Sequence, residues 1–402
     1  MNGSRPDRPW LPPAAICEVG DFFLNCSVAS SPAQVRAVIQ GLLTLLITAT
    51  VAGNLLIIIA VATSRQLRTQ TNAFIASMAV ADLLVGLTVM PYSMMRSVHQ
   101  CWSTWNATSP NDVLARYYGR TFCKAHTCLE YVFTTASILH LGAIAFDRHT
   151  AICDPLRYRQ RITPRRVAHL LAASWLLPFL YVPPVSLGWN VVGVEAAARR
   201  LSCPDSCVVL KNVGFALVDT CCAFFAPTAL MLVAYAKIYR VARRQARQIA
   251  ASSTGTASVV TASVKQQQQQ QNHLQEQGNE QQATFRRTMK REHSATKTLA
   301  IILGAFIVCW CPYFVASAVD PFVGFSTEPA LLSATLWLCY ANSALNPVLY
   351  AAFNRRFRAA FSRIFCRGKG NAAVVVMVAA AWRDRRRPRP PPPAAPEEES
   401  DS

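Results

Sequence analysis

Seven long apolar runs restrict what this chain can fold into. A helix needs roughly 20 residues to cross the ~30 Å hydrocarbon core of a bilayer. The chain is 52% hydrophobic and only 15% charged, which is far more apolar than a soluble domain of this length. We therefore predict an all-α membrane protein, a bundle of seven transmembrane helices. The expected spans are about 38–63, 72–98, 119–152, 165–187, 212–240, 294–320 and 329–352.

Proline inside several of these runs supports a membrane location. A soluble helix resists proline, whereas a bundle in lipid re-satisfies the freed carbonyl with neighbouring groups. The prolines also predict kinks in the helices. They are Pro91, Pro178, Pro227, Pro312 and Pro347.

The distribution of lysine and arginine predicts the orientation. Four segments are rich in these residues, and 99–118 and 188–211 are less basic. The positive-inside rule then predicts an extracellular N-terminus and a cytoplasmic C-terminus. We expect a multi-pass protein of the plasma membrane. The net charge of +19 reflects topology and contact with anionic membrane lipids, and no nucleic-acid partner is expected. The basic segments are 64–70, 154–166, 237–297 and the tail from Arg355.

Composition divides the chain into three parts. Residues 1–37 form an extracellular N-terminal segment without a visible signal peptide, so the first span is expected to direct insertion. Residues 38–366 form the bundle, which ends in a short amphipathic cytoplasmic helix, "RRFRAAFSRIF". The Ser/Gln-rich third cytoplasmic loop, 241–293, and the tail, 367–402, are predicted to be disordered. The glutamines read as a linker or a partner-binding tract, and the apolar run 371–382 is too short to span.

Several residues outside the spans are candidates for modification. Asn2, Asn25 and Asn106 fit the glycosylation sequon in segments predicted to be extracellular. Cys366 follows the amphipathic helix and is a candidate for palmitoylation, or else a plain surface thiol. An even number of cysteines lies on the oxidising side, where disulfides form. They are Cys17, Cys26, Cys101, Cys123, Cys203 and Cys207.

Three acids lie at membrane depth: Asp82, Glu130 and Asp219. An ionisable group there costs roughly 2.5–3.5 kcal/mol on insertion scales and tends to mark function. Asp82 has polar residues available on other spans, which would form a sodium site or a network that only holds the helices together. These residues are Asn54, Ser137, Asn342 and Asn346.

Spaced motifs occur one per span and in a fixed order. They are "GNLLII", "MAVADLL", Cys123 with "DRH", Trp175, Pro227, "CWCPYF" and "NPVLY". Together they resemble a rhodopsin-type (class A) G-protein-coupled receptor from about residue 38 to 366. "FCKAHT", "CPDSC" and "DPF" after "CWCPYF" resemble the trace amine-associated receptors within the aminergic group.

The resemblance implies roles for individual residues. Arg148 would release Asp147 and engage a heterotrimeric G protein, stimulatory by analogy, with arrestin and a receptor kinase as further partners. Tyr235 and Tyr350 would support Arg148, and Trp310 would be a rotamer switch. Further activation residues are Phe306, Pro227, Asn346 and Pro347. The allosteric sodium ion would lie among Asp82, Ser137, Asn342 and Asn346.

The resemblance also implies a bridge between Cys123 and Cys207. "CPDSC" offers a second thiol beside this bridge, so we predict Cys17–Cys203, and Cys26–Cys101 follows by elimination. The closed loops would stiffen the extracellular lid.

Two residues depart from the family pattern. His149 stands where tyrosine is usual, and Glu130 stands where amine receptors usually carry aspartate. Glu130 follows Cys123 by seven residues, so it lies about 10 Å further along the helix, near the floor of an extracellular-facing pocket. A carboxylate there supplies the counter-charge and hydrogen bonds that a protonated amine needs.

Asp219 repeats this argument on the fifth span, and the two acids could also share one proton. Four aromatic residues would box an ammonium, with the Tyr340 hydroxyl orienting Glu130. We therefore predict a receptor for diamines or polyamines, and the resemblance to the trace amine-associated receptors implies a chemosensory or olfactory role. The alternative is a monoamine receptor of the serotonin or dopamine sort, against which Ala223 counts because a polar residue is usual there. The aromatic residues are Tyr313, Phe314, Trp337 and Tyr340.

Other functions lack the residues that they need. A retinal photoreceptor requires a lysine in the seventh span, and 329–352 has none. Repeated halves or a pore motif, as in transporters and channels, are not seen. No metal-spaced cluster or nucleophile motif points to an enzyme.

Overall fold

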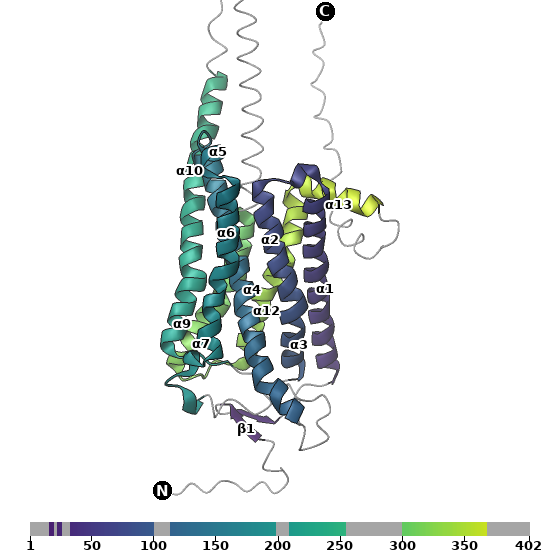
Figure 1. The fold of residues 1–402 in the computed structure, drawn as a ribbon, viewed down its shortest axis with the longest axis vertical. Coiled ribbons are helices and arrows are strands. Elements are labelled where there is room, and N and C mark those ends of the chain that lie inside the picture. Colours follow the sequence, from purple (N-terminus) through teal and green to yellow (C-terminus); the bar gives the residue numbers. More distant parts are fainter. Residues whose placement is uncertain are drawn as a thin grey trace, which may run out of the picture.

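The structure is a computed structural model. It describes residues 16–19, 22–25, 33–99, 113–197, 209–254 and 300–367. Long helices stand side by side with their axes near one direction (Figure 1). A two-stranded antiparallel hairpin, β1 (Ile16–Val19) and β2 (Phe22–Asn25), lies at one end of this bundle.

The first three spans are long, and the second is built from three pieces. The first is α1 (Ala33–Thr63) and the third is α4 (Val113–Cys153). A short 3-10 turn, η1 (Arg65–Leu67), follows α1. The second span consists of α2 (Gln70–Leu84), the π-helical turn η2 (Val85–Val89) and α3 (Met90–His99).

The fourth and fifth spans are also interrupted. The fourth contains α6 (Pro164–Leu176), the 3-10 segment η3 (Leu177–Tyr181) and α7 (Val182–Ser186), with α5 (Tyr158–Arg161) before it and η4 (Trp189–Val191) after it. The fifth contains α9 (Val213–Asp219), the π-helical turn η5 (Thr220–Phe225) and α10 (Ala226–Thr254).

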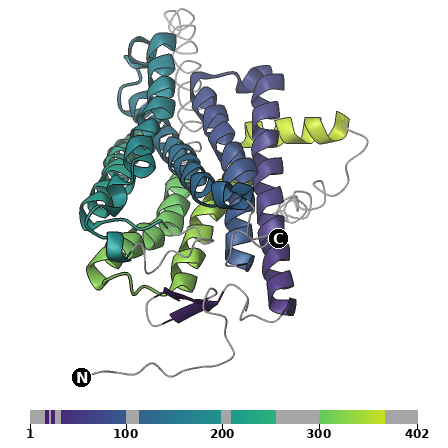
Figure 2. The same cartoon turned by 60° about the horizontal axis from the view of Figure 1, so that its bottom comes forward.

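The sixth helix covers Ala300–Val323 and ends in η7 (Asp320–Val323). The seventh is α12 (Pro329–Phe353), and α13 (Arg355–Arg367) follows it. Figure 2 shows α13 leaving the bundle beside α1. Phe357, Ala360 and Phe361 of α13 are buried, so one apolar face of this helix packs against the bundle.

The two π-helical turns have a cause in the sequence. Proline lacks a backbone N–H and displaces the carbonyl four residues earlier. Those carbonyls belong to Leu87 for Pro91 and to Ala223 for Pro227, and both residues lie in a π-helical turn. Such turns often mark functional sites, and η5 directly follows Asp219.

Among the described residues, six helices are long and apolar enough to cross a membrane, and α12 is not one of them. Asn342, Ser343 and Asn346 lower the hydropathy of α12, although these side chains are buried inside the bundle. Many apolar side chains face outward instead, such as Leu180 and Leu230, as expected where lipid replaces water.

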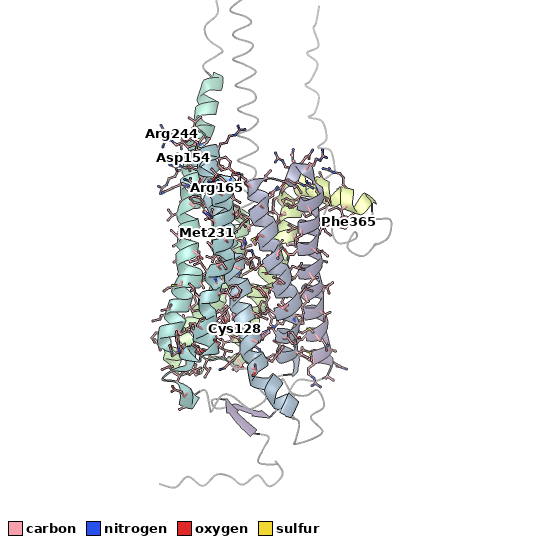
Figure 3. The ribbon with its side chains drawn as sticks, in the orientation of Figure 1. Cys128, Asp154, Arg165, Met231, Arg244 and Phe365 are labelled. Carbon is pink, nitrogen blue, oxygen red and sulfur yellow. The ribbon has the colours of Figure 1, made fainter. Side chains whose placement is uncertain are left out.

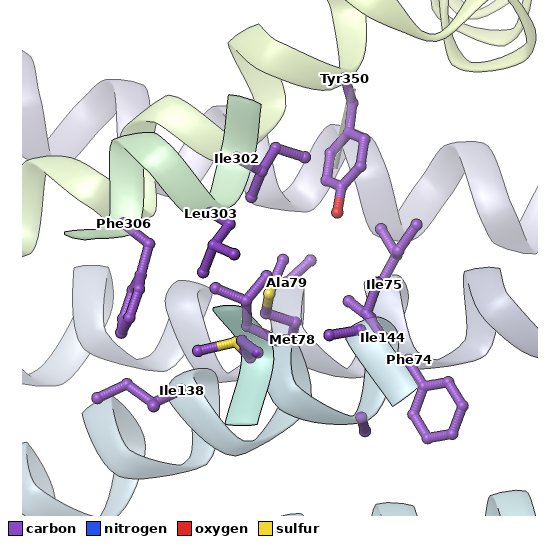
Figure 4. Packing of buried hydrophobic residues seen from close by; sticks show 14 of the residues in the cluster. Phe74, Ile75, Met78, Ala79, Ile138, Ile144, Ile302, Leu303, Phe306 and Tyr350 are labelled. Carbon is purple, nitrogen blue, oxygen red and sulfur yellow. The ribbon is translucent and has the colours of Figure 1, made fainter. Parts of the chain in front are cut away.

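The bundle core gathers apolar side chains from all sides. Figure 4 shows part of this cluster, with Met78, Ala79 and Leu303 near its centre and Phe306 and Phe74 at opposite edges. Close approach of α1 to α12 depends on a missing side chain. A Cβ on Gly53 would lie 2.7 Å from Cγ of Pro347, so only glycine fits without a shift of the neighbouring helix.

Three predicted boundaries differ from the structure. α1 begins at Ala33, so the predicted N-terminal segment 1–37 contains its first turn. α4 begins at Val113 rather than 119. α10 continues to Thr254, and the start of the predicted disordered loop, 241–293, is therefore helical. Hydropathy detects only the part of a helix that crosses lipid, whereas these helices extend beyond it.

Candidate functional site

Glu130 on α4 is held by a tyrosine from α12. The Tyr340 hydroxyl donates a hydrogen bond to Glu130 Oε1 at 2.6 Å, so the contact predicted between these side chains is present. Tyr340 is 1% exposed, and Glu130 is half-buried. A carboxylate accepts several hydrogen bonds, so Glu130 is oriented by Tyr340 and still has acceptor capacity for a ligand.

A polar chain from α3 supports Tyr340. The hydroxyls of Ser93 and Tyr340 lie 3.0 Å apart. Ser93 Oγ is 3.5 Å from His126 Nε2, which also lies 3.0 Å from the Val89 carbonyl. All these side chains are buried, so the chain fixes the Tyr340 hydroxyl, and the sequence did not indicate Ser93 or His126.

Trp337 packs beside Tyr340 on α12. The two rings meet edge to face with centroids 5.2 Å apart. Trp337 Nε1 donates to Ser97 Oγ at 2.9 Å, which fixes the indole against α3. The wall of the site next to Glu130 is therefore aromatic and rigid.

Asp219 ends α9 and forms a buried ion pair with Lys211. Lys211 Nζ lies 2.7 Å from Asp219 Oδ2, and the side chains are 8% and 1% exposed. The sequence prediction missed this partner, because Lys211 lies just before the fifth span and looked like an ordinary loop cation. A lysine eight residues before an acid at membrane depth was the available signal.

Groups from three helices surround the Lys211 ammonium. It donates to Ser317 Oγ at 3.0 Å. It also lies 5.4 Å from the ring centroid of Tyr131 and 5.6 Å from that of Tyr313, within cation–π range. Tyr313 was predicted to contact a ligand ammonium, and in this structure its ring faces the ammonium of Lys211.

The backbone on both sides of Lys211 is tied to η4. Asn190 Nδ2 donates to the Leu210 carbonyl at 2.7 Å, and Asn212 N donates to the Asn190 carbonyl at 2.6 Å. Asn212 also caps α9, where its Oδ1 accepts from Phe215 N at 2.8 Å. These bonds hold the Lys211 side chain against Asp219.

Charge pairing keeps Lys211 protonated. Burial alone lowers the pKa of a lysine, but the Asp219 carboxylate raises the pKa of Lys211 well above its ordinary value. Asp219 Oδ1, by contrast, is buried and has no hydrogen-bond partner in the described part of the chain.

We call Glu130, Asp219, Tyr131, Tyr313 and Tyr340 the two-acid site. Tyr131 follows Glu130 on α4 and contacts Lys211, so the two acids flank one group of aromatic rings. Behind the site, Phe314 stacks on Phe224 at 4.8 Å and on Trp310 at 5.8 Å. Trp310 packs on Phe306 at 6.1 Å. The predicted switch residues are thus in contact with the predicted ligand residue Phe314.

Asp82 is fully buried between α2, α4 and α12. Its Oδ1 accepts from Ser137 at 2.9 Å and from Ser343 at 2.8 Å, and its Oδ2 accepts from Asn346 at 2.9 Å. Ser343 was not predicted to take part. Asn342, which was, lines a small adjacent cavity together with Ser137 and Asn346. Asn54 bonds instead to the backbone of Thr50 and Ser343.

A second polar cluster lies at the α13 end of the bundle. Arg148 Nη2 is 2.6 Å from Asp147 Oδ2, and it also bonds to the Thr71 hydroxyl. Thr71 donates to Asp147 Oδ2 at 2.6 Å and Tyr158 donates to Asp147 Oδ1 at 2.9 Å. Both carboxylate oxygens of Asp147 therefore accept hydrogen bonds, and Thr71 and Tyr158 join the predicted Asp147–Arg148 pair.

Three predicted switch residues have buried polar atoms without a partner among the described residues. They are Tyr235, Trp310 and Tyr350. An unpaired buried polar group costs about 1–3 kcal/mol, so these atoms gain from a rearrangement that supplies partners. This is consistent with the implied movement of Tyr235 and Tyr350.

Most of the predicted bridges depend on residues outside the described ranges, namely Cys26, Cys101, Cys203 and Cys207. Cys123 is disulfide-bonded. The bridges Cys123–Cys207, Cys17–Cys203 and Cys26–Cys101 stay predictions, as do glycosylation at Asn2, Asn25 and Asn106 and palmitoylation at Cys366. The tail 367–402 and most of the third loop also lie outside the description.

A seven-helix bundle with buried acids and an Asp–Arg pair at one end defines a helical membrane receptor for a small cationic ligand. The sequence matches the 7 transmembrane receptor (rhodopsin family) over residues 53–350, and the chain belongs to this family.

Known relatives share most of the chain. It is 40% identical over 347 residues to trace amine-associated receptor 365 of Petromyzon marinus, covering 86% of this chain and 84% of the relative. It is 36% identical to trace amine-associated receptor 13c of Danio rerio, over 85% of this chain and 89% of that protein. It is 38% identical to human 5-hydroxytryptamine receptor 4, over 82% of this chain and 80% of that protein.

These findings confirm the predicted class. The chain is an aminergic, multi-pass G-protein-coupled receptor, which binds an amine and couples to a G protein, and it is not an enzyme. The predicted seven-helix bundle is confirmed as well.

Proposed function

We propose that this receptor detects an amine whose ammonium group pairs with Glu130. The single observation that carries this proposal is that the Glu130 carboxylate is oriented but not paired with a cation. It is oriented by Tyr340 but has no ion-pair partner in the described part of the chain, whereas Asp219 is already paired. A half-buried carboxylate without a cation favours binding of a charged donor.

Replacing Glu130 by glutamine tests this assignment. Glu130→Gln keeps the size of the side chain and removes its charge, so amine potency should fall at least about tenfold, or 1.4 kcal/mol. The control is surface expression, which should stay normal. An unchanged potency for every active amine would exclude Glu130 as the anchor.

A diamine or polyamine is the second candidate ligand. Lys211 is itself an alkylammonium bound at Asp219, which supports the idea that this position accommodates one. A second ligand ammonium would have to exchange with Lys211. Diamines of graded length should then gain potency as their span approaches the separation of the two acids, and a flat series would refute this candidate.

The cellular role follows from the end of the bundle at α13. Basic side chains, among them Arg165 and Arg244, gather there (Figure 3). This supports an orientation with the N-terminus outside. By analogy with the family, we propose a plasma-membrane receptor that couples to a stimulatory G protein and is regulated by arrestin and a receptor kinase. A chemosensory or olfactory role rests on the likeness to trace amine-associated receptors alone. A cyclic-nucleotide assay in transfected cells would test the G-protein class.

Asp82 and its neighbours are suited to bind sodium. The hard oxygens of Asp82, Ser137 and Ser343 converge beside the cavity lined by Asn342 and Asn346. The ion would stabilise the conformation in which Asp82 is charged. Agonist affinity should fall as sodium rises, and Asp82→Asn should remove that dependence.

A further inference from the structure

We propose that Lys211 determines which charge of ligand the receptor accepts, because it turns the Asp219 end of the two-acid site into a subsite for a neutral hydrogen-bond donor. The preferred ligand then carries one ammonium for Glu130 and a hydroxyl or similar neutral donor for Asp219. This inference rests on the proposed role of Glu130 as the amine anchor.

The first step of the argument is the unequal state of the two Asp219 oxygens. Oδ2 accepts from Lys211 Nζ at 2.7 Å. Oδ1 is buried and has no partner within the described residues, and the same holds for the hydroxyl of the next residue, Thr220. Buried polar atoms are normally satisfied, so Oδ1 is an acceptor that a ligand donor would fill.

The second step is the balance of charge. Glu130 and Asp219 each contribute one negative charge and Lys211 contributes one positive charge. Lys211 neutralises Asp219, so Glu130 is the carboxylate of the two-acid site that is left to pair with a ligand ammonium. A dication would leave one excess positive charge among buried groups, which is strongly unfavourable.

The third step concerns the contacts that keep the Lys211 side chain in place. Its ammonium contacts Asp219, Ser317 and two tyrosine rings, and its backbone neighbours are tied to η4. A second ligand ammonium must break all these side-chain contacts to reach Asp219 Oδ2. A neutral hydroxyl, by contrast, needs only the unpaired acceptor Oδ1 and does not compete with Lys211 for Oδ2.

The test compares ligand classes on the full-length receptor in cells. The probes are 4-(2-aminoethyl)phenol, the same amine without its hydroxyl, and straight-chain diamines of graded length. The wild type should respond best to the hydroxylated monoamine. A better response to a diamine than to this monoamine would overturn the inference.

Lys211→Met removes the charge and keeps the length of the side chain. We expect the potency ratio of the best diamine to the hydroxylated monoamine to rise at least about tenfold. The double variant Lys211→Met/Asp219→Asn is the matched control, and its ratio should return towards the wild-type value. Lys211→Gln, which keeps a hydrogen bond to Asp219, should shift the ratio in the same direction and serves if Lys211→Met fails to reach the surface.

An unchanged ratio in the surface-expressed Lys211 variants would overturn the inference. Failure of the proposed function looks different, because all probes would then act equally on the wild type and on Glu130→Gln. A loss of response in Glu130→Gln together with an unchanged ratio in Lys211→Met would reject the role of Lys211 alone.

Discussion

Lys211 Nζ and Asp219 Oδ2 lie 2.7 Å apart, with both side chains almost completely buried. In the sequence Asp219 had no evident partner, and an unpaired acid at membrane depth predicts a cationic ligand. Since Lys211 supplies that cation, the second acid no longer requires a second ligand charge. Of these two acids, Glu130 is the one whose carboxylate has no ion-pair partner among the described residues.

Breaking this ion pair from one side should destabilise the receptor. Asp219→Asn leaves the Lys211 ammonium buried without its counter-charge, a change worth about 3–5 kcal/mol. The double variant Lys211→Met/Asp219→Asn removes both charges and should lose much less. Thermal unfolding of purified receptor measures the difference, and equal melting temperatures for the two variants would argue against a buried pair.

Loss of the Tyr340 hydroxyl should weaken amine binding. Tyr340→Phe removes the 2.6 Å bond that orients Glu130, and a hydrogen bond to a charged group is worth about 1.5–3 kcal/mol. Affinity measured by ligand competition should therefore fall roughly tenfold or more. Tyr239→Phe is the control, since Tyr239 is 65% exposed and should have no effect. Equal affinities in both variants would contradict the orienting role.

Arg148 should be required for signalling but not for ligand binding. It lies roughly 27 Å along α4 from Glu130, at 1.5 Å per residue. Arg148→Ala should keep agonist affinity and surface expression while abolishing G-protein activation. Arg161→Ala is the comparison, because it breaks only an exposed pair with Asp154 and should act weakly. Preserved signalling in Arg148→Ala would refute the assignment.

Tyr158 should restrain basal activity independently of pH in the physiological range. It donates to Asp147 at 2.9 Å, and burial and the nearby Asp147 charge raise the pKa of Tyr158 to about 12. The pKa of Tyr158 in the folded receptor is higher than the pKa of about 10 that tyrosine has in an unfolded chain. The stability that Tyr158 contributes is therefore fully present below about pH 10 and is lost only as the pH rises through about 12.

Tyr158→Phe should therefore increase basal G-protein activation roughly tenfold or more, since a hydrogen bond to a charged group is worth about 1.5–3 kcal/mol. Basal activity of the wild type should stay constant between about pH 6 and pH 8, far below that pKa. If basal activity changes with pH in the wild type but not in Tyr158→Phe within this window, Tyr158 does not act through its neutral hydroxyl.

The sequence predicts those parts of the fold that depend on hydropathy and spacing. Apolar length identifies the spans, and acids at membrane depth identify Asp82, Glu130 and Asp219 because a charge in lipid is rare. Hydropathy does not show where helices continue into water, so the extension of α10 to Thr254 was missed.

The missed site residues have a common physical reason. Ser93, Ser343 and Thr71 carry hydroxyls, which are frequent in helices and are important here only because three-dimensional packing aims them at Tyr340, Asp82 and Arg148. Lys211 lies in a connecting segment, where a cation is normally solvated. Only the fold of η4 and α9 brings it onto Asp219.

The most direct test of the amine site is a thermodynamic cycle that compares the binding of two ligands to two receptor variants. Binding of an active amine and of its uncharged carbon isostere is measured on the wild type and on Glu130→Gln. If Glu130 pairs with the ammonium, the wild type should favour the amine by at least about 1.4 kcal/mol more than the variant does. Equal preferences in the two proteins would contradict that pairing and with it the proposed function.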